Sequence, residues 1–232
     1  MRTAITSASL AALIAGLAPA TAHAATALGN MTAGATLGIT TPVGVDIGDF
    51  TNILPDEEIN TSGSGLGTTS TVTTKNALFG LETFADATAG PETGSADAAR
   101  SNEGVFTVTN DTVESQTITF NLDWSLDGEA TLTNASLDSA SAFGTVGLGE
   151  GQTGSSLFFE ELSLAGLEGG NSQVASDDWS LDFDLRAGET ATFNLSTFSE
   201  AEAASVIPLP AGLPLLLAGL GALALLRRAR RS

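Results

Sequence analysis

The stretch that decides the fold is TITFNLDWSL, residues 117–126, in which polar and apolar side chains alternate at every position. In a β-strand successive side chains point to opposite faces, so this period of two predicts a strand with one face in a core and the other in solvent. A second stretch, DWSLDFDL at residues 178–185, alternates in the same way. Two long strands of this kind predict an all-β unit.

Shorter patterns extend this prediction along the chain. The turn RAGE, 186–189, leads into the alternating TATFNLS, 190–196, which predicts a terminal β-hairpin. Further strands are also predicted. Residues 85–102, which are rich in Ala, Gly, Ser and Asp, are interpreted as a long loop. The fold class that follows is an antiparallel β-sandwich, jelly-roll or immunoglobulin-like. The further strands are expected at residues 68–74, 77–83, 104–109, 130–137 and 156–164.

The N-terminus has the layout of a secretory signal peptide over residues 1–24. Arg2 is followed by an apolar stretch, and the segment ends on Ala22, His23 and Ala24, an A-x-A cleavage site. We expect a signal helix there, handled by the Sec translocon and signal peptidase, and a mature chain that begins at Ala25. The apolar stretch is shorter than the ~20 residues that a membrane-spanning helix requires.

The C-terminus carries a second apolar segment, residues 211–226, without a charged side chain. A basic cluster follows it, and basic residues after an apolar run stop transfer and stay cytoplasmic. The cluster comprises Arg227, Arg228, Arg230 and Arg231. We expect a short transmembrane helix at 211–226 that anchors the chain transiently in the inner membrane. Prolines at 208, 210 and 214 each remove a backbone donor, which predicts an extended segment before the helix.

The last 27 residues, 206–232, resemble a known sorting signal. The sequence VIPLPA followed by a Leu/Ala/Gly helix and an arginine cluster is similar to the VPLPA-CTERM tail, a variant of the bacterial PEP-CTERM class. Ile207 is inserted relative to that pattern. The resemblance implies recognition by an exosortase-type membrane protease, removal of the helix, and transfer of the preceding domain to the cell surface or medium. The motif residues are Val206, Pro208, Leu209, Pro210 and Ala211.

Residues 25–205 form the predicted ectodomain, which contains all 27 acidic residues of the chain. Its basic residues are Lys75, Arg100 and Arg186, so its net charge is near −24 and nucleic acid is excluded as a partner. Residues 200–205 are interpreted as a linker to the tail. Residues 25–64 are left open as either an edge strand with turns or an irregular arm, because Gly, Thr and Pro interrupt their apolar fragments.

The mature chain lacks both histidine and cysteine, since His23 is removed with the signal peptide. This composition excludes Ser-His-Asp and Cys-His nucleophilic systems, His-ligated zinc and a disulfide framework. Hard cations remain possible, because calcium prefers oxygen ligands. Asp178, Ser180, Asp182 and Asp184 share one strand face at intervals of about 7 Å. Asp178, Asp182 and Asp184 are the candidate metal ligands, against the alternative of a solvated polar face.

Trp124 and Trp179 are candidates for a sugar-stacking platform, but both stand in the apolar phase of their strands, which predicts that they point into the core. The sequence therefore favours a non-enzymatic protein of the cell surface or extracellular matrix, with no cofactor other than calcium and with exopolysaccharide as a candidate partner. A carbohydrate- or calcium-binding adhesion module is the first alternative. A glycosidase that uses two carboxylates is the second.

Overall fold

The computed structural model describes residues 26–53, 57–61, 64–74, 78–90, 94–151 and 155–205. These residues form strands joined by turns, and no helix occurs among them. The all-β class is therefore confirmed for the described part of the chain. The strands are β1 (Ala27–Thr40), β2 (Val45–Ile47), β3 (Thr51–Ile53), β4 (Glu57–Thr61), β5 (Ser64–Thr74), β6 (Leu78–Ala89), β7 (Ser95–Asn110), β8 (Gln116–Leu132), β9 (Asp138–Glu150), β10 (Ser156–Ala165), β11 (Leu167–Glu168), β12 (Asn171–Leu185) and β13 (Thr190–Ser205).

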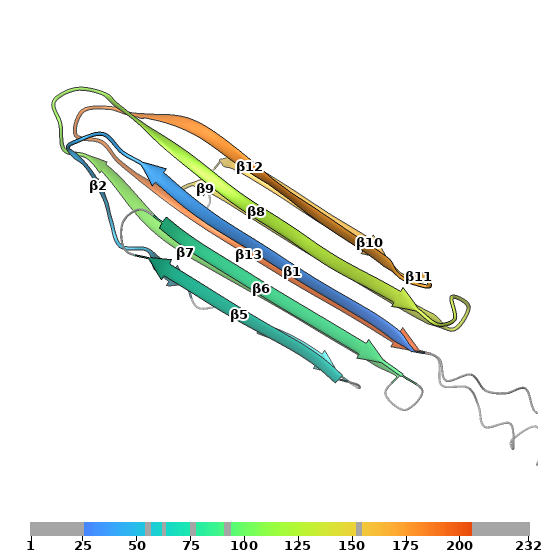
Figure 1. The fold of residues 1–232 in the computed structure, drawn as a ribbon. Coiled ribbons are helices and arrows are strands. Elements are labelled where there is room, and N and C mark those ends of the chain that lie inside the picture. Colours follow the sequence, from blue (N-terminus) through green and yellow to red (C-terminus); the bar gives the residue numbers. More distant parts are fainter. Residues whose placement is uncertain are drawn as a thin grey trace, which may run out of the picture. The chain divides into compact units, whose positions relative to one another are not determined.

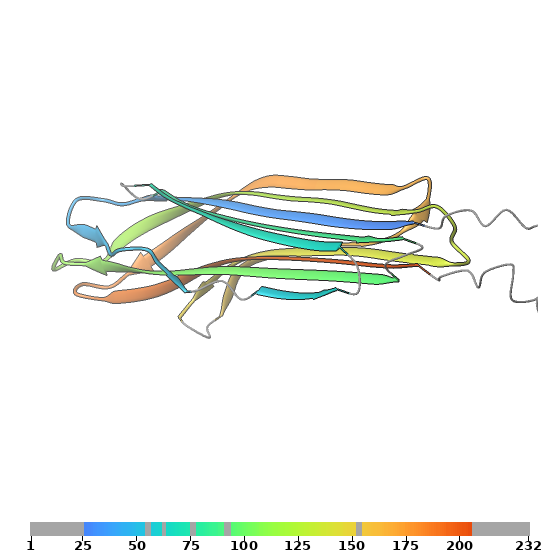
Figure 2. The same ribbon diagram turned by 90° about the horizontal axis from the view of Figure 1, so that it is seen from below.

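The strands assemble into two antiparallel sheets, which lie face to face (Figures 1 and 2). Sheet A has the order β12-β8-β1-β6-β5, and the two-residue β11 adds a short parallel pair to β8. Sheet B has the order β10-β9-β13-β7-β2, with β3 and β4 also paired to β7. Apolar residues of both sheets share the same core clusters, so the inward faces of the two sheets are packed against each other.

The core between the sheets has two chemically different halves. One half holds packed aromatic rings: Phe79 and Phe106 are stacked with centroids 4.9 Å apart, and Phe120 and Phe193 meet edge to face with centroids 4.8 Å apart. The other half is built mainly from alanine, with Met31 as its largest side chain. At Gly29 in this half, a Cβ atom would lie 2.5 Å from the backbone oxygen of Ser141, so the sheets approach each other closely there. Small side chains are what permit this approach.

A buried polar contact joins the two sheets through the core. The hydroxyl groups of Thr83 on β6 and Ser199 on β13 are 2.8 Å apart, and the Ser199 hydroxyl is also 3.1 Å from the Thr83 carbonyl oxygen. Both residues are fully buried. Buried polar groups are costly unless they are hydrogen-bonded, so this pair favours one position of β6 over β13.

Three segments differ from the predictions made for them. Within residues 85–102, interpreted as a loop, residues 85–89 form the end of β6 and residues 95–102 form the start of β7. Residues 200–205, interpreted as a linker, form the C-terminal end of β13. For residues 27–40 both alternatives, an edge strand with turns and an irregular arm, are wrong, since β1 lies in the middle of sheet A between β6 and β8. Many of the inward positions in these segments are alanine, and small residues give a weak hydrophobic period.

The predicted hairpin at residues 178–196 is also wrong. β12 pairs with β8 in sheet A, whereas β13 lies between β7 and β9 in sheet B. The intervening turn carries the chain from one sheet to the other. It is closed by a bond from the Glu189 backbone N–H to the Arg186 carbonyl at 3.1 Å, and by a bond from the Arg186 N–H to the Glu189 side chain at 2.7 Å.

The two ends of the described β unit lie together, at the alanine-rich end (Figure 1). The Thr26 backbone N–H donates to the Thr133 hydroxyl at 2.7 Å, and that hydroxyl is 3.1 Å from a carboxylate oxygen of Asp138. Asp138 pairs in turn with Ser205, the last residue of β13. The opposite end of the sheets carries the turns 41–44, 111–115 and 186–189.

Candidate functional site

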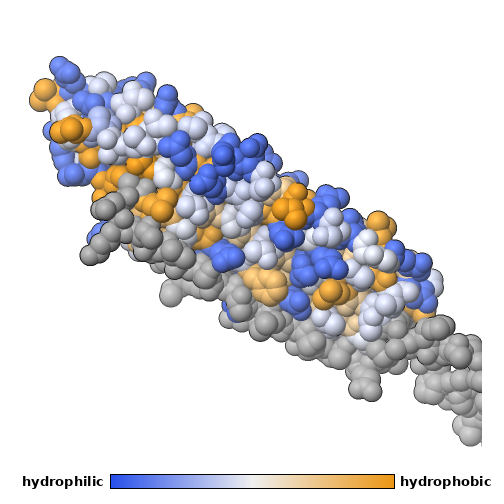
Figure 3. All heavy atoms as spheres, viewed as in Figure 1, coloured by the Kyte–Doolittle hydropathy of each residue, from blue (hydrophilic) through white to orange (hydrophobic). Residues whose placement is uncertain are grey.

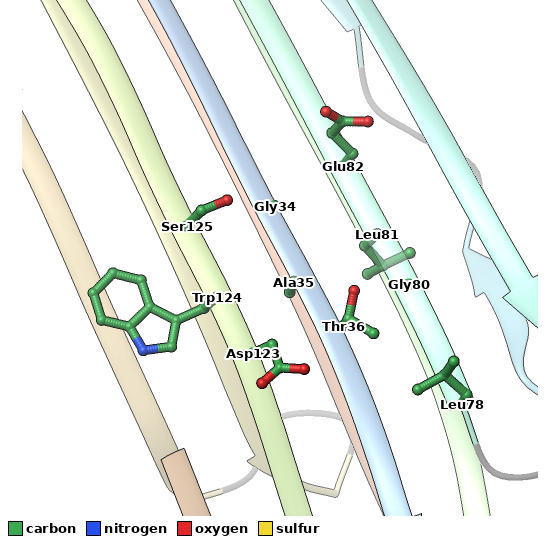
Figure 4. Close-up of a pocket in the computed structure, with 10 residues that line it drawn as sticks. All are labelled: Gly34, Ala35, Thr36, Leu78, Gly80, Leu81, Glu82, Asp123, Trp124 and Ser125. Carbon is green, nitrogen blue, oxygen red and sulfur yellow. The ribbon is translucent and has the colours of Figure 1, made fainter. Parts of the chain in front are cut away.

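A hollow lies on the outer face of sheet A (Figure 4). Its volume is about 520 Å³. Gly34 on β1 lies between Glu82 of β6 and Ser125 of β8, and one rung further along Thr36 lies between Gly80 and Asp123. The floor is open because the two glycines carry no side chain. The hollow is thus a depression in the surface of a sheet, bordered by polar side chains and by Leu78.

The face around this hollow is strongly acidic. No lysine or arginine occurs in the described strands of sheet A. In the space-filling view the face is a mixture of hydrophilic and intermediate residues with separate apolar patches (Figure 3). A surface of this kind favours cations and neutral hydrogen-bond donors over anions. The outward acidic residues are Glu82, Asp86, Asp123, Asp127, Glu129, Asp178, Asp182 and Asp184.

Two of these carboxyl groups share a hydrogen bond. Asp123 on β8 and Asp178 on β12 are directly opposite each other in the register. A hydrogen bond that the protonated Asp123 carboxyl donates to the Asp178 side chain raises the pKa of Asp123 above its ordinary value, and desolvation and the charge of Asp178 act in the same direction. The pair lies at the rim of the hollow, on an exposed edge of the sheet.

The three candidate metal ligands do not meet at one point. Asp182 accepts a hydrogen bond from the Thr119 hydroxyl at 2.7 Å, and Asp184 accepts one from the Thr117 hydroxyl at 2.6 Å. Asp178 faces Asp123 further along the same edge. Among the described residues no group of three or more acidic, histidine or cysteine side chains could hold a metal ion. Calcium binding by these residues stays a prediction.

The two tryptophans are directed toward the core. Trp124 and Trp179 are half-buried, pack against the large aromatic cluster and contact Phe158, with ring centroids 5.9 Å and 5.3 Å from it. Figure 4 shows the Trp124 ring turned away from the other side chains around the hollow. The aromatic group that the structure does expose beside a hollow is Phe159, which is 56% exposed.

Apart from Trp124, sequence reasoning did not single out the residues of the sheet A hollow. A usable signal was present, because Gly34, Gly38 and Gly80 all fall in the polar, outward phase of their strands. The sequence does not reveal the register between β1 and β6, and it is this register that places Gly34 and Gly80 on adjacent rungs.

The export and sorting residues lie outside the described residues. These are the signal peptide with Ala22 and Ala24, the motif of Val206, Pro208, Leu209, Pro210 and Ala211, the helix at 211–226, and Arg227, Arg228, Arg230 and Arg231. Within the described part of the chain, no helix is long and apolar enough to cross a membrane. A comparison with protein-family models and with curated proteins finds no match.

Proposed function

We propose that the chain is a non-enzymatic protein of the cell surface or extracellular matrix, exported by its signal peptide and sorted by its C-terminal tail. One observation carries this proposal: β13 ends at Ser205, and the VIPLPA motif begins at the next residue. A protease that cuts within or just after the motif would therefore leave β13 and its hydrogen bonds to β7 and β9 intact.

The position of the chain ends supports the same role. Because Thr26 and Ser205 lie at one end of the β unit, both processing signals connect to that end. The opposite end, with its three turns, is the part that such a protein would present outward. This role needs no cofactor. Its partners are signal peptidase, the Sec translocon and an exosortase-type protease.

We further infer that the two sheets form a β-sandwich of the jelly-roll kind. Four-stranded layers β6-β1-β8-β12 and β7-β13-β9-β10 lie within the two sheets. The short β11 is left out, and the remaining strands are counted from β6 through β13 with β1 placed last. The order within both layers is then that of two interlocked Greek keys. The chain is then a circular permutation of a jelly roll, in which the closing strand comes first. An immunoglobulin-like order does not alternate between the sheets in this way.

The proposal is tested by the intact mass of the protein recovered from the envelope and the medium of its native host. We expect a chain that begins at Ala25 and ends near Pro210. A Pro208→Ala variant should accumulate with the tail attached, because the extended protease-binding segment is lost. Pro214→Ala, within the apolar segment, is the matched control and should be processed normally. Recovery of wild-type protein that retains residues 213–232 would show a permanent anchor and would contradict sorting.

A further inference from the structure

A second, smaller hollow lies on the outer face of sheet B and has a different chemistry. Its volume is about 180 Å³, and its floor is formed by Gly147 and Gly149 of β9. Asn194 and Ser196 of β13 border it on one side, and Phe159 of β10 borders it on the other. We call it the Phe159 hollow.

A β-bulge places the Phe159 ring at this hollow. Ser156 pairs with Gly149 and Phe158 pairs with Leu148, so Leu157 is an extra residue in β10. The bulge moves every later side chain of β10 to the opposite face. As a result Phe158 is buried at 9% exposure, whereas Phe159 stands on the outer face opposite Gly147 at 56% exposure.

A side-chain amide is held in one orientation on the other side of the hollow. The Asn194 Nδ2 group donates to a carboxylate oxygen of Glu103 at 3.2 Å, which turns Oδ1 toward β9. A Cβ atom at Gly149 would overlap this Oδ1, so only glycine leaves room for it. Oδ1 is buried and has no hydrogen-bond partner. Because Oδ1 is covered at Gly149 and closed to solvent, the Asn194 side chain acts as a fixed part of the wall of the hollow.

The two serine hydroxyl groups of the hollow favour a ligand that donates hydrogen bonds. The Ser196 hydroxyl is 3.4 Å from the Gly147 carbonyl oxygen, and the Ser156 hydroxyl is 3.2 Å from the Phe158 carbonyl oxygen. If both hydroxyl hydrogens point to these carbonyls, both oxygens are left as acceptors. None of the residues that line the hollow is charged. A ligand with one apolar face and several hydroxyl donors fits this arrangement, and the hollow holds on the order of six water volumes, enough for one sugar ring.

We propose that the Phe159 hollow binds a neutral saccharide, with one ring stacked on Phe159 and its hydroxyl groups donating to Ser156 and Ser196. The acidic ectodomain opposes anionic sugars, which is why the proposal names a neutral one. This inference rests on the proposed function, because it names the class of partner that a surface or matrix protein would hold.

The test uses the full chain in micelles of a zwitterionic detergent that contains no sugar. Saturation-transfer NMR and calorimetry are recorded with cellohexaose, laminarihexaose and maltohexaose, and with hexagalacturonic acid as the anionic control. We expect at least one neutral hexasaccharide to bind and the anionic one not to bind. Phe159→Ala should weaken that binding about tenfold or more, whereas Phe159→Trp should retain it. Gly149→Ala should weaken it as well, because it displaces the Asn194 amide.

Two variants serve as matched controls. Val174→Ala shortens a side chain on β12 that is 65% exposed, and it should leave the affinity unchanged. Leu78→Ala alters the rim of the sheet A hollow and should also have no effect. The proposal is overturned if no neutral hexasaccharide binds, if Phe159→Ala binds as well as wild type, or if Leu78→Ala abolishes binding. These results are independent of tail processing: a permanently anchored chain that binds the sugar would contradict sorting and leave the site intact.

Discussion

The Asp123–Asp178 pair shows how a single contact between side chains makes stability depend on pH. The folded state raises the pKa of Asp123, mainly through its hydrogen bond to Asp178. A raised pKa means that the folded state binds a proton more tightly than the unfolded state does. Stability therefore falls as pH rises from the ordinary aspartate value, near 3.9, through the raised value, and stays lower above it.

Replacing one member of this pair should remove that loss. We expect Asp178→Asn to be more stable than wild type at pH 7, with the advantage shrinking as the pH approaches 4. The measurement is urea denaturation followed by tryptophan fluorescence at several pH values. Asp184→Asn on the same strand faces Thr117 and is the matched control, because it has no carboxyl partner across the strand. A variant less stable than wild type at pH 7 would show that the two carboxyl groups do not repel each other in the folded state.

At the scale of the strand, close packing of the two sheets depends on glycine at one position of β1. A methyl group at Gly29 would meet backbone atoms of Ser141 and Glu202, which cannot move aside as a flexible side chain can. Gly29→Ala should therefore lower the free energy of unfolding by roughly 1 to 3 kcal/mol, as overpacking does. The same substitution at Gly38 meets no atom closer than 3.7 Å and should be tolerated. Equal urea midpoints for the two variants would contradict the close approach of the sheets.

The strands also show what could be predicted from the sequence. β8 and β12 were found because large apolar residues, such as Phe120 and Leu122, mark the buried phase clearly. The end of β6 and the start of β7 are interpreted as a loop because Ala87 and Ala98 mark that phase only weakly, although both are fully buried. The turn at 186–189 predicts a hairpin because local residues specify a reversal of direction but do not specify whether the chain changes sheet.

The Phe159 hollow escaped prediction for a related reason. The run Leu157, Phe158 and Phe159 breaks the alternation, and such a break is the local sign of a bulge. This break predicts that a side chain is redirected to the other face, but it does not predict which groups the Phe159 ring will face. Gly147 and Asn194 reach the same place only through pairings that span long stretches of sequence.

At the scale of the whole β unit, the proposed jelly-roll order predicts that the chain ends can be moved. A permuted chain that begins at Leu78, joins Ser205 to Thr26 through a short glycine–serine linker and ends at Thr74 keeps every long strand in one piece. We expect it to give the same β-rich circular dichroism spectrum and one cooperative unfolding transition, because the joined ends already lie together. A chain cut instead between Asn121 and Leu122 interrupts a central strand and should not fold. Failure of the first permutant to fold would contradict the proposed order.

The location of β13 also determines how the β unit would respond to force. It is hydrogen-bonded along nearly its whole length to β7 on one side and to β9 on the other. A pull on the chain beyond Ser205 is directed along this strand, so the load is shared by many rungs of two ladders at once. Strands loaded in this direction must shear and cannot be peeled apart one bond at a time. A protein held by its C-terminus against moving fluid would thus carry the load on its best-supported strand.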